Sequence, residues 1–151
     1  KDDYRVIMAS CAIPSACRPV EIEGRMYYDG GVTDPIPAKK ALEDGCRKLV
    51  MILSKPRDFV KTPEKFRLFY SLSCAGYPEI VKALNRRHKV YMRSMRYAYE
   101  LEKRGMAFIF APSRHLPMNT YAMDAEANRN LYDLGLKDFY DRYEELKVFL
   151  A

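Results

Sequence analysis

The residues Asp29-Gly30-Gly31 contain the strongest candidate for a chemical role in this sequence. The aspartate follows a short stretch of alternating apolar and polar residues, a pattern typical of a strand. Glycine adopts backbone angles that are closed to other residues, so we expect a sharp turn at Gly30 and Gly31. Catalytic groups are commonly presented on turns at the ends of rigid elements. On these local features alone, an ordinary turn is the better interpretation of Asp-Gly-Gly after a strand.

No serine has the surroundings of an activated nucleophile. In a nucleophile elbow, the serine has one glycine two residues before it and another two residues after it. His88 and His115 form no local pattern with a serine or cysteine that indicates a triad. The serines, none of which is flanked by both glycines, are Ser10, Ser15, Ser54, Ser71, Ser73, Ser94 and Ser113.

The four cysteines, Cys11, Cys17, Cys46 and Cys74, indicate neither a metal site nor a disulfide framework. They include no Cys-x-x-Cys pair, and no histidine lies close enough in sequence to complete a zinc site. Free, buried thiols are expected for a chain of this size. We therefore expect no zinc site at these cysteines and a reducing, cytoplasmic setting.

The elements before and after Asp29 follow from the pattern of apolar residues and turns. Residues 2–11 predict a helix, and the Glu23-Gly24 turn predicts a hairpin whose second arm leads to Asp29. Residues 34–44 predict a second helix. The continuous apolar run at residues 48–53 predicts a strand that is covered on both faces in an α/β sheet.

The remainder of the chain is predicted to be mostly helical. A capping pattern at Thr62-Pro63-Glu64 predicts a helix to about residue 74. The other expected elements are a long amphipathic helix over residues 78–104, a buried strand over 107–110, a loop over 112–119 and two closing helices separated near Gly135.

The long helix carries a stripe of charged, mostly basic residues from Lys82 to Lys103. One interpretation is a contact with a membrane surface, and the other is a solvated face of a helix that packs by its apolar side. The net charge of +6 does not distinguish them. We expect no nucleic-acid partner, because no recognised nucleic-acid module is present.

Length and composition predict one domain or part of one. The chain has 151 residues, of which 48% are hydrophobic. No run approaches the roughly 18 apolar residues of a membrane-spanning helix, and Lys1-Asp2-Asp3-Tyr4 does not begin a signal peptide. We therefore expect a soluble chain. Because the sequence lacks an initiator methionine and begins directly with a predicted helix, we also expect a piece of a longer polypeptide.

A wider pattern around Asp29 resembles the second conserved block of the patatin-like phospholipases. The matching segments run in the family's order and spacing through the first third of the chain. They are residues 9–14, 19–25, 28–37, 41–42 and Gly45, with Tyr28-Asp29-Gly30-Gly31 at their centre. Residues 130–135 and 146–150 are more weakly similar to the helical tail of bacterial intracellular members.

The resemblance implies a serine and aspartate dyad without metal or organic cofactor. In that family, a serine in a Gly-x-Ser-x-Gly elbow attacks the ester carbonyl of a lipid, and the aspartate of the Asp-Gly-Gly turn takes its proton. A glycine-rich loop supplies backbone N–H donors to the oxyanion. Asp29 matches the aspartate, with Gly30 and Gly31 as its turn, whereas the serine and the loop have no counterpart here.

We therefore expect residues 1–151 to be the C-terminal part of a three-layer α/β/α patatin-like domain with a helical C-terminal region. Residues 1–54 would hold the family motif, hairpin, helix and buried strand, and residues 55–151 would be mostly helical with one further strand. The full-length protein would hydrolyse lipid esters, and this chain alone would be inactive and prone to self-association. The alternatives are a non-catalytic module that binds lipid or protein, and an acyltransferase.

Overall fold

The computed structural model describes residues 4–116 and 124–151. The start of the predicted first helix at Asp2 and the end of the predicted loop at Asn119 lie outside these ranges. The chain divides into two compact units: unit 1 consists of Lys1–Pro37 and Lys61–Arg96, and unit 2 of Ala38–Val60 and Tyr97–Ala151. The long predicted helix is α4 (Pro78–Lys103), which contributes residues to both units. The expected division into residues 1–54 and 55–151 stays a prediction.

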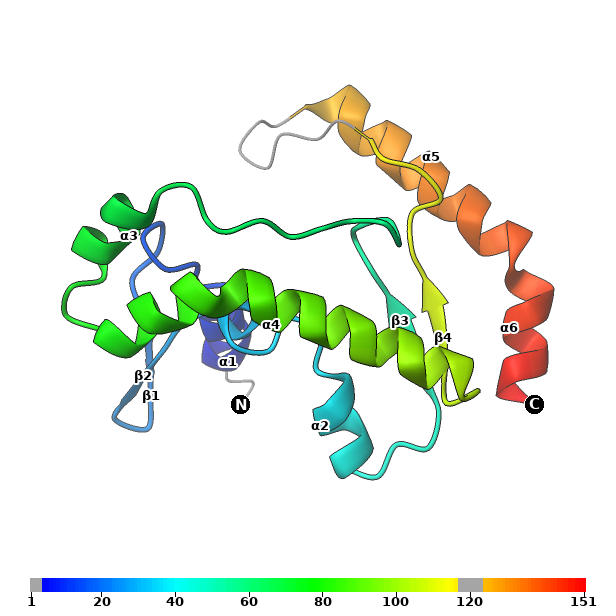
Figure 1. The fold of residues 1–151 in the computed structure, drawn as a ribbon, viewed down its shortest axis with the longest axis horizontal. Coiled ribbons are helices and arrows are strands. Elements are labelled where there is room, and N and C mark those ends of the chain that lie inside the picture. Colours follow the sequence, from blue (N-terminus) through cyan, green and yellow to red (C-terminus); the bar gives the residue numbers. More distant parts are fainter. Residues whose placement is uncertain (1–3, 117–123) are drawn as a thin grey trace. The chain divides into compact units, whose positions relative to one another are not determined.

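Unit 1 contains the predicted hairpin (Figure 1). Its strands β1 (Val20–Ile22) and β2 (Arg25–Tyr27) pair antiparallel. Glu23 and Gly24 have φ angles of 50° and 74°, the left-handed values that a two-residue hairpin turn needs. The hairpin is thus confirmed. The other elements of this unit are α1 (Arg5–Ser10), the 3-10 helix η1 (Gly30–Val32), α3 (Arg67–Ser73) and the first part of α4.

Helix α3 begins later than the capping pattern predicted. Thr62-Pro63-Glu64 was expected to start the helix, but α3 starts at Arg67. The Glu64 carboxylate instead forms ion pairs with Lys61 at 3.0 Å and with Arg87 of α4 at 3.4 Å. Contacts with a distant helix have therefore replaced the local capping arrangement.

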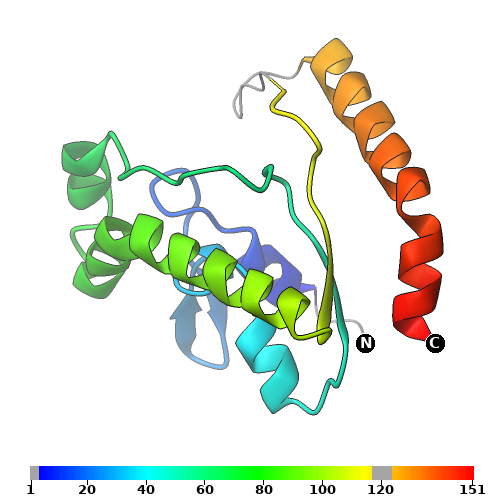
Figure 2. The ribbon, with the colours of Figure 1, turned by 45° about the vertical axis from the view of Figure 1, so that its right-hand side comes forward.

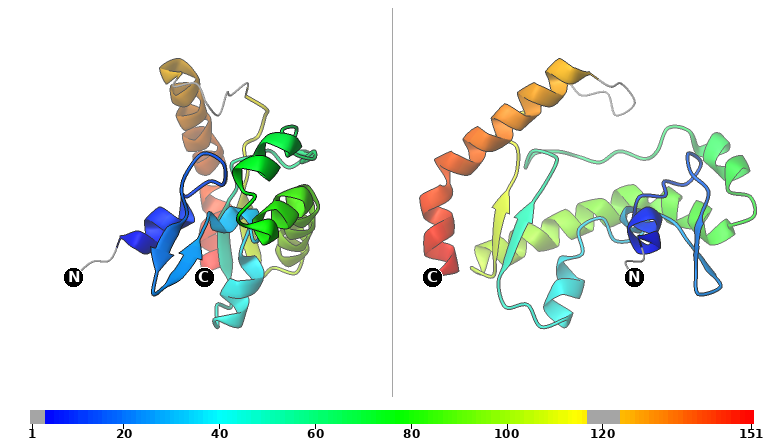
Figure 3. Two further views of the ribbon diagram at one scale, coloured as in Figure 1. Left: turned by 90° about the vertical axis from the view of Figure 1, so that its left-hand side faces the viewer. Right: turned by 180° about the vertical axis from the view of Figure 1, so that it is seen from behind.

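A small apolar cluster joins the turn after β2 to the two helices. Val32 is 3% exposed and packs with Tyr70 of α3 and Leu84 of α4. The Tyr70 hydroxyl also donates a hydrogen bond to Oδ1 of Asn85 at 2.9 Å. Figure 3 shows α3 beside the first turns of α4. Through Val32, this cluster anchors the turn that contains Asp29 to α3 and α4.

Unit 2 contains a parallel pair of strands, β3 (Leu49–Ile52) and β4 (Ala107–Phe110). Both predicted strands are thus confirmed, and in register Val50 lies beside Phe108 and Ile52 beside Phe110. The other elements of this unit are α2 (Ala38–Glu43), α5 (Ala125–Asp141), α6 (Tyr143–Leu150) and the last part of α4. The mixed α/β class with a helical C-terminal region is confirmed at this level.

The prediction that the first strand is covered on both faces was wrong. Residues of β3 alternate between half-buried and exposed, and the Ile52 side chain is 83% exposed. On that face, Phe149 of α6 contacts Phe108 and Phe139 of α5 contacts Phe110, with ring centroids 5.7 and 5.6 Å apart. The aromatic residues of β4 are therefore covered, while the neighbouring side chains of β3 are not.

The predicted break near Gly135 was also wrong. Helix α5 runs without interruption to Asp141, as Figure 2 shows. A glycine inside a helix costs only about 1 kcal/mol relative to alanine. The break comes at Arg142, whose guanidinium lies 4.3 Å from the Phe108 ring and donates to the backbone oxygen of Ile109 at 2.7 Å. These contacts hold the chain in the non-helical conformation of Arg142.

Candidate functional site

Asp29 lies at the head of a tight turn that its own carboxylate closes. Oδ1 of Asp29 accepts a hydrogen bond from the backbone N–H of Gly31 at 2.7 Å, so Asp29 is the N-cap of η1. The backbone N–H of Asp29 donates to the oxygen of Ala12 at 2.9 Å, which ties the turn to the segment after α1. Among the described residues, no other group hydrogen-bonds to this half-buried carboxylate.

The two glycines of this turn were expected to adopt backbone angles that are closed to other residues, but they do not. Neither Gly30 nor Gly31 has a positive φ, so the turn does not need backbone angles reserved for glycine. A Cβ atom on Gly31 would lie 3.1 Å from Oδ1 of Asp29, which is tighter than ordinary contact, whereas one on Gly30 would meet nothing within 4 Å. A side chain at position 31 would therefore make the carboxylate of Asp29 or the turn shift, whereas one at position 30 would not.

Arg87 of α4 holds the same turn from the other side. Its Nε donates a hydrogen bond to the backbone oxygen of Gly31 at 3.1 Å, and its Nη1 pairs with Glu64. Lys61 pairs with the same Glu64 carboxylate. Gly31 therefore donates its N–H to Asp29 and accepts from Arg87 with its carbonyl. We call Lys61, Glu64 and Arg87 the arginine clamp.

Sequence reasoning missed the arginine clamp. Arg87 is 56 residues from Gly31 and stands among many basic residues of α4, so no spacing marks it. The sequence pattern marks Glu64 only as part of a predicted helix start, Thr62-Pro63-Glu64. One signal was available in principle: Arg87 falls on the apolar side of the predicted helix. A basic side chain that is buried there needs a charged or hydrogen-bonding partner.

The tyrosine before the aspartate packs as a neutral side chain. The rings of Tyr28 and Tyr77 meet edge to face with centroids 5.6 Å apart. Burial, with smaller contributions from Cys74 and Tyr77, raises the pKa of the Tyr28 phenol above its usual value. At neutral pH Tyr28 is therefore protonated and supports the turn by packing.

The structure brings no nucleophile to Asp29 within the described residues. The Ser15 hydroxyl and the Cys74 thiol contact each other at 3.6 Å, and His115 pairs with Asp58 at 3.0 Å. His88 Nδ1 is buried and has no hydrogen-bond partner among the described residues. All four cysteines are free, as expected, but only Cys74 is buried, so the expectation of four buried thiols was wrong. The side chains of Cys11, Cys17 and Cys46 lie in surface turns and loops.

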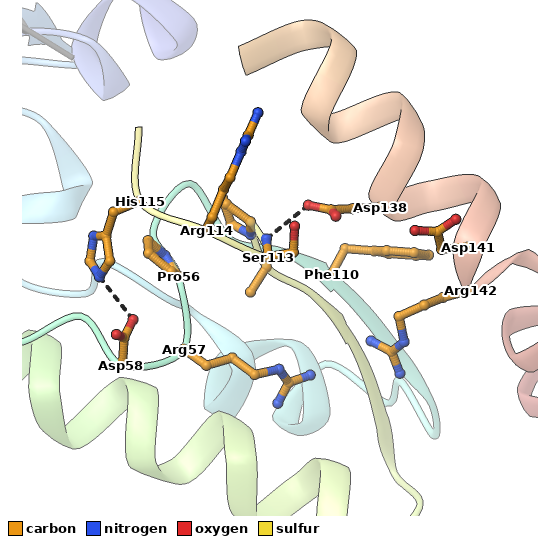
Figure 4. Close-up of a pocket in the computed structure, with 12 residues that line it drawn as sticks. Pro56, Arg57, Asp58, Phe110, Ser113, Arg114, His115, Asp138, Asp141 and Arg142 are labelled. Atoms are coloured by element: carbon orange, nitrogen blue, oxygen red, sulfur yellow. Dashed lines mark hydrogen bonds and ion pairs between the residues drawn. The ribbon is translucent and has the colours of Figure 1, made fainter. Parts of the chain in front are cut away.

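A cavity of about 650 Å³ lies in unit 2 (Figure 4). It lies beyond the carboxyl ends of the parallel strands β3 and β4, where α/β proteins commonly bind ligands. Its arginines, however, are mostly engaged by the protein itself: Arg57 and Arg142 both donate to the backbone oxygen of Ile109, at 3.1 and 2.7 Å. Arg57 forms a two-pronged pair with Glu102 at 2.6 and 2.7 Å, Arg142 pairs with Glu145, and Arg114 points away from both. This cavity therefore presents no cluster of free charges for a ligand.

The described residues offer neither a metal-binding cluster nor a membrane-spanning helix. Residues 4–116 and 124–151 contain no group of three or more histidine, cysteine, aspartate or glutamate side chains that could hold a metal ion. Within the same residues, no helix is both long enough and apolar enough to cross a membrane.

Comparisons with known proteins agree with the pattern around Asp29. Residues 4–42 match the family model of the patatin-like phospholipases, and residues 77–151 match that of a domain of unknown function, DUF6363. The uncharacterized protein YjjU of Escherichia coli K12 is 44% identical over 63 residues, which are 41% of this chain and 18% of YjjU. The matched part thus spans less than a fifth of that relative. No solved structure matches the chain.

Proposed function

We propose that this chain, which carries part of a patatin-like phospholipase domain, is the C-terminal portion of a serine hydrolase of lipid esters with Asp29 as its general base. The observation that carries the proposal is the position of Asp29. It lies within residues 4–42, the part that matches the family, and its carboxylate is fixed by Gly31 on one oxygen only. The serine nucleophile and the oxyanion donors would come from a part of the polypeptide outside this chain.

The geometry suits a proton acceptor that must keep one orientation. With Oδ1 held by the Gly31 N–H, Oδ2 is the oxygen that remains for a serine hydroxyl. In the proposed reaction, the serine oxygen attacks the ester carbonyl while its proton passes to Asp29. Asp29 then returns the proton to the departing alcohol. A water molecule hydrolyses the acyl-serine in the second half, with Asp29 again accepting and returning a proton.

The test is hydrolysis of a fluorogenic short-chain ester by the full-length polypeptide. Asp29→Asn keeps an oxygen for the Gly31 N–H but cannot accept the proton, so we expect turnover to fall about a thousandfold or more. The matched control is Asp34→Asn, an exposed carboxylate five residues later, which should keep full activity. The 151-residue chain alone should show no turnover.

Full activity in a folded Asp29→Asn variant would contradict the proposed mechanism and show that Asp29 is only a turn residue. A well-folded full-length protein that is inert on a broad panel of esters would favour the alternative of a non-catalytic binding module. Transfer of the acyl group to added glycerol in preference to water would favour the acyltransferase alternative.

A further inference from the structure

A polar cavity of about 420 Å³ in unit 1 is lined by residues of helices α3 and α4 and of the segment before α3. Figure 3 shows the two helices side by side. The volume is in the range of sites for small molecules. The polar residues of the wall include Glu64, Arg67, Tyr70, Lys82, Asn85 and Arg86. We call this site the α3/α4 cavity.

The spacing of residues along the two helices brings these polar side chains to one cavity. Arg67 precedes the buried Tyr70 by three residues, so it lies on the side of α3 that packs against the protein. On α4, Asn85 and Arg86 follow Lys82 by three and four residues. The Tyr70 hydroxyl donates to Oδ1 of Asn85 at 2.9 Å and thereby joins the two helices at the cavity wall.

The wall of the α3/α4 cavity presents hydrogen-bond donors that the protein itself does not use. Within residues 4–116 and 124–151, the guanidinium groups of Arg67 and Arg86 form no ion pair and no hydrogen bond. Because Oδ1 of Asn85 is taken by Tyr70, the side-chain amide group of Asn85 is a further donor. His88 also lines the cavity, and its buried Nδ1 lacks a hydrogen-bond partner within the same residues, whereas buried polar atoms are normally hydrogen-bonded.

The carboxylate of the wall is already paired. Glu64 forms ion pairs with Lys61 and Arg87 of the arginine clamp. Lys82 is paired with Glu79 at 2.6 Å. The two remaining guanidinium groups therefore give the cavity an excess of positive charge. A cavity with an excess of one sign of charge concentrates ligands of the opposite sign.

We propose that the α3/α4 cavity binds the phosphate group of a small phosphorylated molecule. Arg67 and Arg86 would donate to phosphate oxygens, and the amide of Asn85 would be a third donor. A guanidinium presents its N–H groups in a fork that fits the oxygens of a phosphate. A phosphate monoester carries a charge of about −1.5 to −2 at neutral pH, which matches two unpaired arginines.

The polypeptide outside this chain is the competing occupant, because it could place an aspartate or glutamate in the cavity. Such a side chain brings a single negative charge, so one of the two arginines would stay unbalanced. Charge therefore favours the phosphate. The experiment uses the full-length polypeptide, in which a segment that fills the cavity would exclude the ligand.

This site differs from the membrane contact that the basic stripe suggested. The stripe runs along α4 from Lys82 to Lys103, whereas the cavity combines the first turns of α4 with Arg67 of α3. The proposal also goes beyond ester hydrolysis and does not rest on it. Phosphate binding is measured without turnover, so its outcome is independent of the Asp29→Asn experiment.

The experiment is isothermal titration calorimetry of the full-length polypeptide with glycerol phosphate, and with acetate at the same ionic strength as a stand-in for a carboxylate. We expect saturable binding of glycerol phosphate and much weaker binding of acetate. Arg67→Gln and Arg86→Gln should each weaken glycerol phosphate binding about tenfold or more, because each removes charge-assisted hydrogen bonds. The matched control is Arg93→Gln, an exposed arginine further along α4 and outside the cavity wall, which should bind like wild type.

Asn85→Asp tests the third donor without disturbing the packing of the helices. It keeps an acceptor for the Tyr70 hydroxyl but replaces the amide donor with a negative charge. We expect it to weaken glycerol phosphate binding about tenfold or more, because like charges repel.

A second measurement locates the contact directly. Arg67, Arg86 and Arg93 are all exposed, so phenylglyoxal, which modifies arginine side chains, should react with each of them. Glycerol phosphate should slow the modification of Arg67 and Arg86 and leave that of Arg93 unchanged, as identified by peptide mass analysis.

The source of the phosphate is determined with a third probe. Vesicles of phosphatidylcholine mixed with phosphatidic acid present a phosphate monoester on a lipid. Binding of glycerol phosphate indicates a soluble ligand. Binding to these vesicles alone, weakened by Arg86→Gln, indicates a lipid head group with the same chemistry.

Three results would overturn the proposal. The first is that the full-length polypeptide binds neither glycerol phosphate nor the vesicles with phosphatidic acid, as expected if another segment fills the cavity. The second is equal binding by wild type, Arg67→Gln and Arg86→Gln, and the third is binding of acetate as tight as that of glycerol phosphate. Because both arginines are exposed, the thermal midpoint of each variant should stay near that of wild type, which verifies folding.

Discussion

The carboxylate of Asp29 and the backbone N–H of Gly31 lie 2.7 Å apart, and a Cβ atom on Gly31 would lie only 3.1 Å from the same carboxylate oxygen. The same residue is held on its carbonyl side by Arg87 at 3.1 Å. The orientation of the candidate base thus depends on one glycine that is fixed by two side chains.

Gly31→Ala should impair activity far more than Gly30→Ala. An added Cβ at position 31 would press on Oδ1 of Asp29, so the carboxylate must rotate or the turn must shift, whereas position 30 has open space. A loss of about a hundredfold in kcat is expected, because small displacements of a catalytic group have effects of that size. Ester hydrolysis by the full-length polypeptide measures it. Equal rates for the two variants would contradict this account of the turn.

Arg87→Met should lower kcat with little change in KM. The arginine clamp holds the Gly31 carbonyl and does not contact the substrate in the proposed reaction, so its loss loosens the turn that presents Asp29. Arg93→Met, an exposed position on the same helix, is the control. Addition of guanidinium to the Arg87→Ala variant should restore part of the activity. Failure of that rescue, together with unchanged kcat in Arg87→Met, would show that the clamp is only structural.

The pair of Arg57 and Glu102 should make stability depend on pH in the acid range. Burial raises the pKa of Glu102, but the hydrogen bonds and charge of Arg57 outweigh it, so the pKa lies below the usual 4.5. A carboxyl whose pKa is lower in the folded state stabilises the protein above its unfolded pKa, and this stabilisation is lost as pH falls through the folded pKa.

We therefore expect the free energy of unfolding to decline below about pH 4.5. Glu102→Gln should cost about 1 kcal/mol at neutral pH, a modest value because Arg57 is half exposed and solvent screens the pair. The variant should also flatten the acid decline. Urea unfolding of the 151-residue chain at several pH values checks both expectations, with the exposed Glu100→Gln as control. A parallel decline in Glu102→Gln and wild type would contradict the assignment.

The four cysteine thiols should react with a labelling reagent at two different rates, set by their exposure. Cys11, Cys17 and Cys46 are exposed, whereas Cys74 is 0% exposed at the inner end of α3. Labelling of the native 151-residue chain with a thiol reagent should therefore modify three cysteines rapidly and Cys74 slowly. All four should react at once in denaturant. Rapid labelling of native Cys74, identified by peptide mass analysis, would show that α3 does not pack as described.

Short-range patterns in the sequence were enough to predict the local elements and the resemblance to a patatin-like block. The hairpin follows from Glu23-Gly24, the long helix from its periodicity, and the two strands of unit 2 from short apolar runs, because each signal lies within a few residues. The motif around Asp29 is equally local, and it identified the patatin-like block that the family comparison confirms.

The residues that surround that motif could not be predicted from the sequence, because they come from distant segments of the folded chain. Arg87 hydrogen-bonds to Gly31 although 56 residues of sequence separate them. Glu64, which was predicted to lie at the start of a helix, forms an ion pair with Arg87 instead. Likewise, α5 continues through Gly135, and β3 leaves Ile52 exposed. The physical reason is the same in each case. Local propensities are worth about 1 kcal/mol or less per residue, so contacts between distant segments override them, and such contacts exist only after the chain has folded.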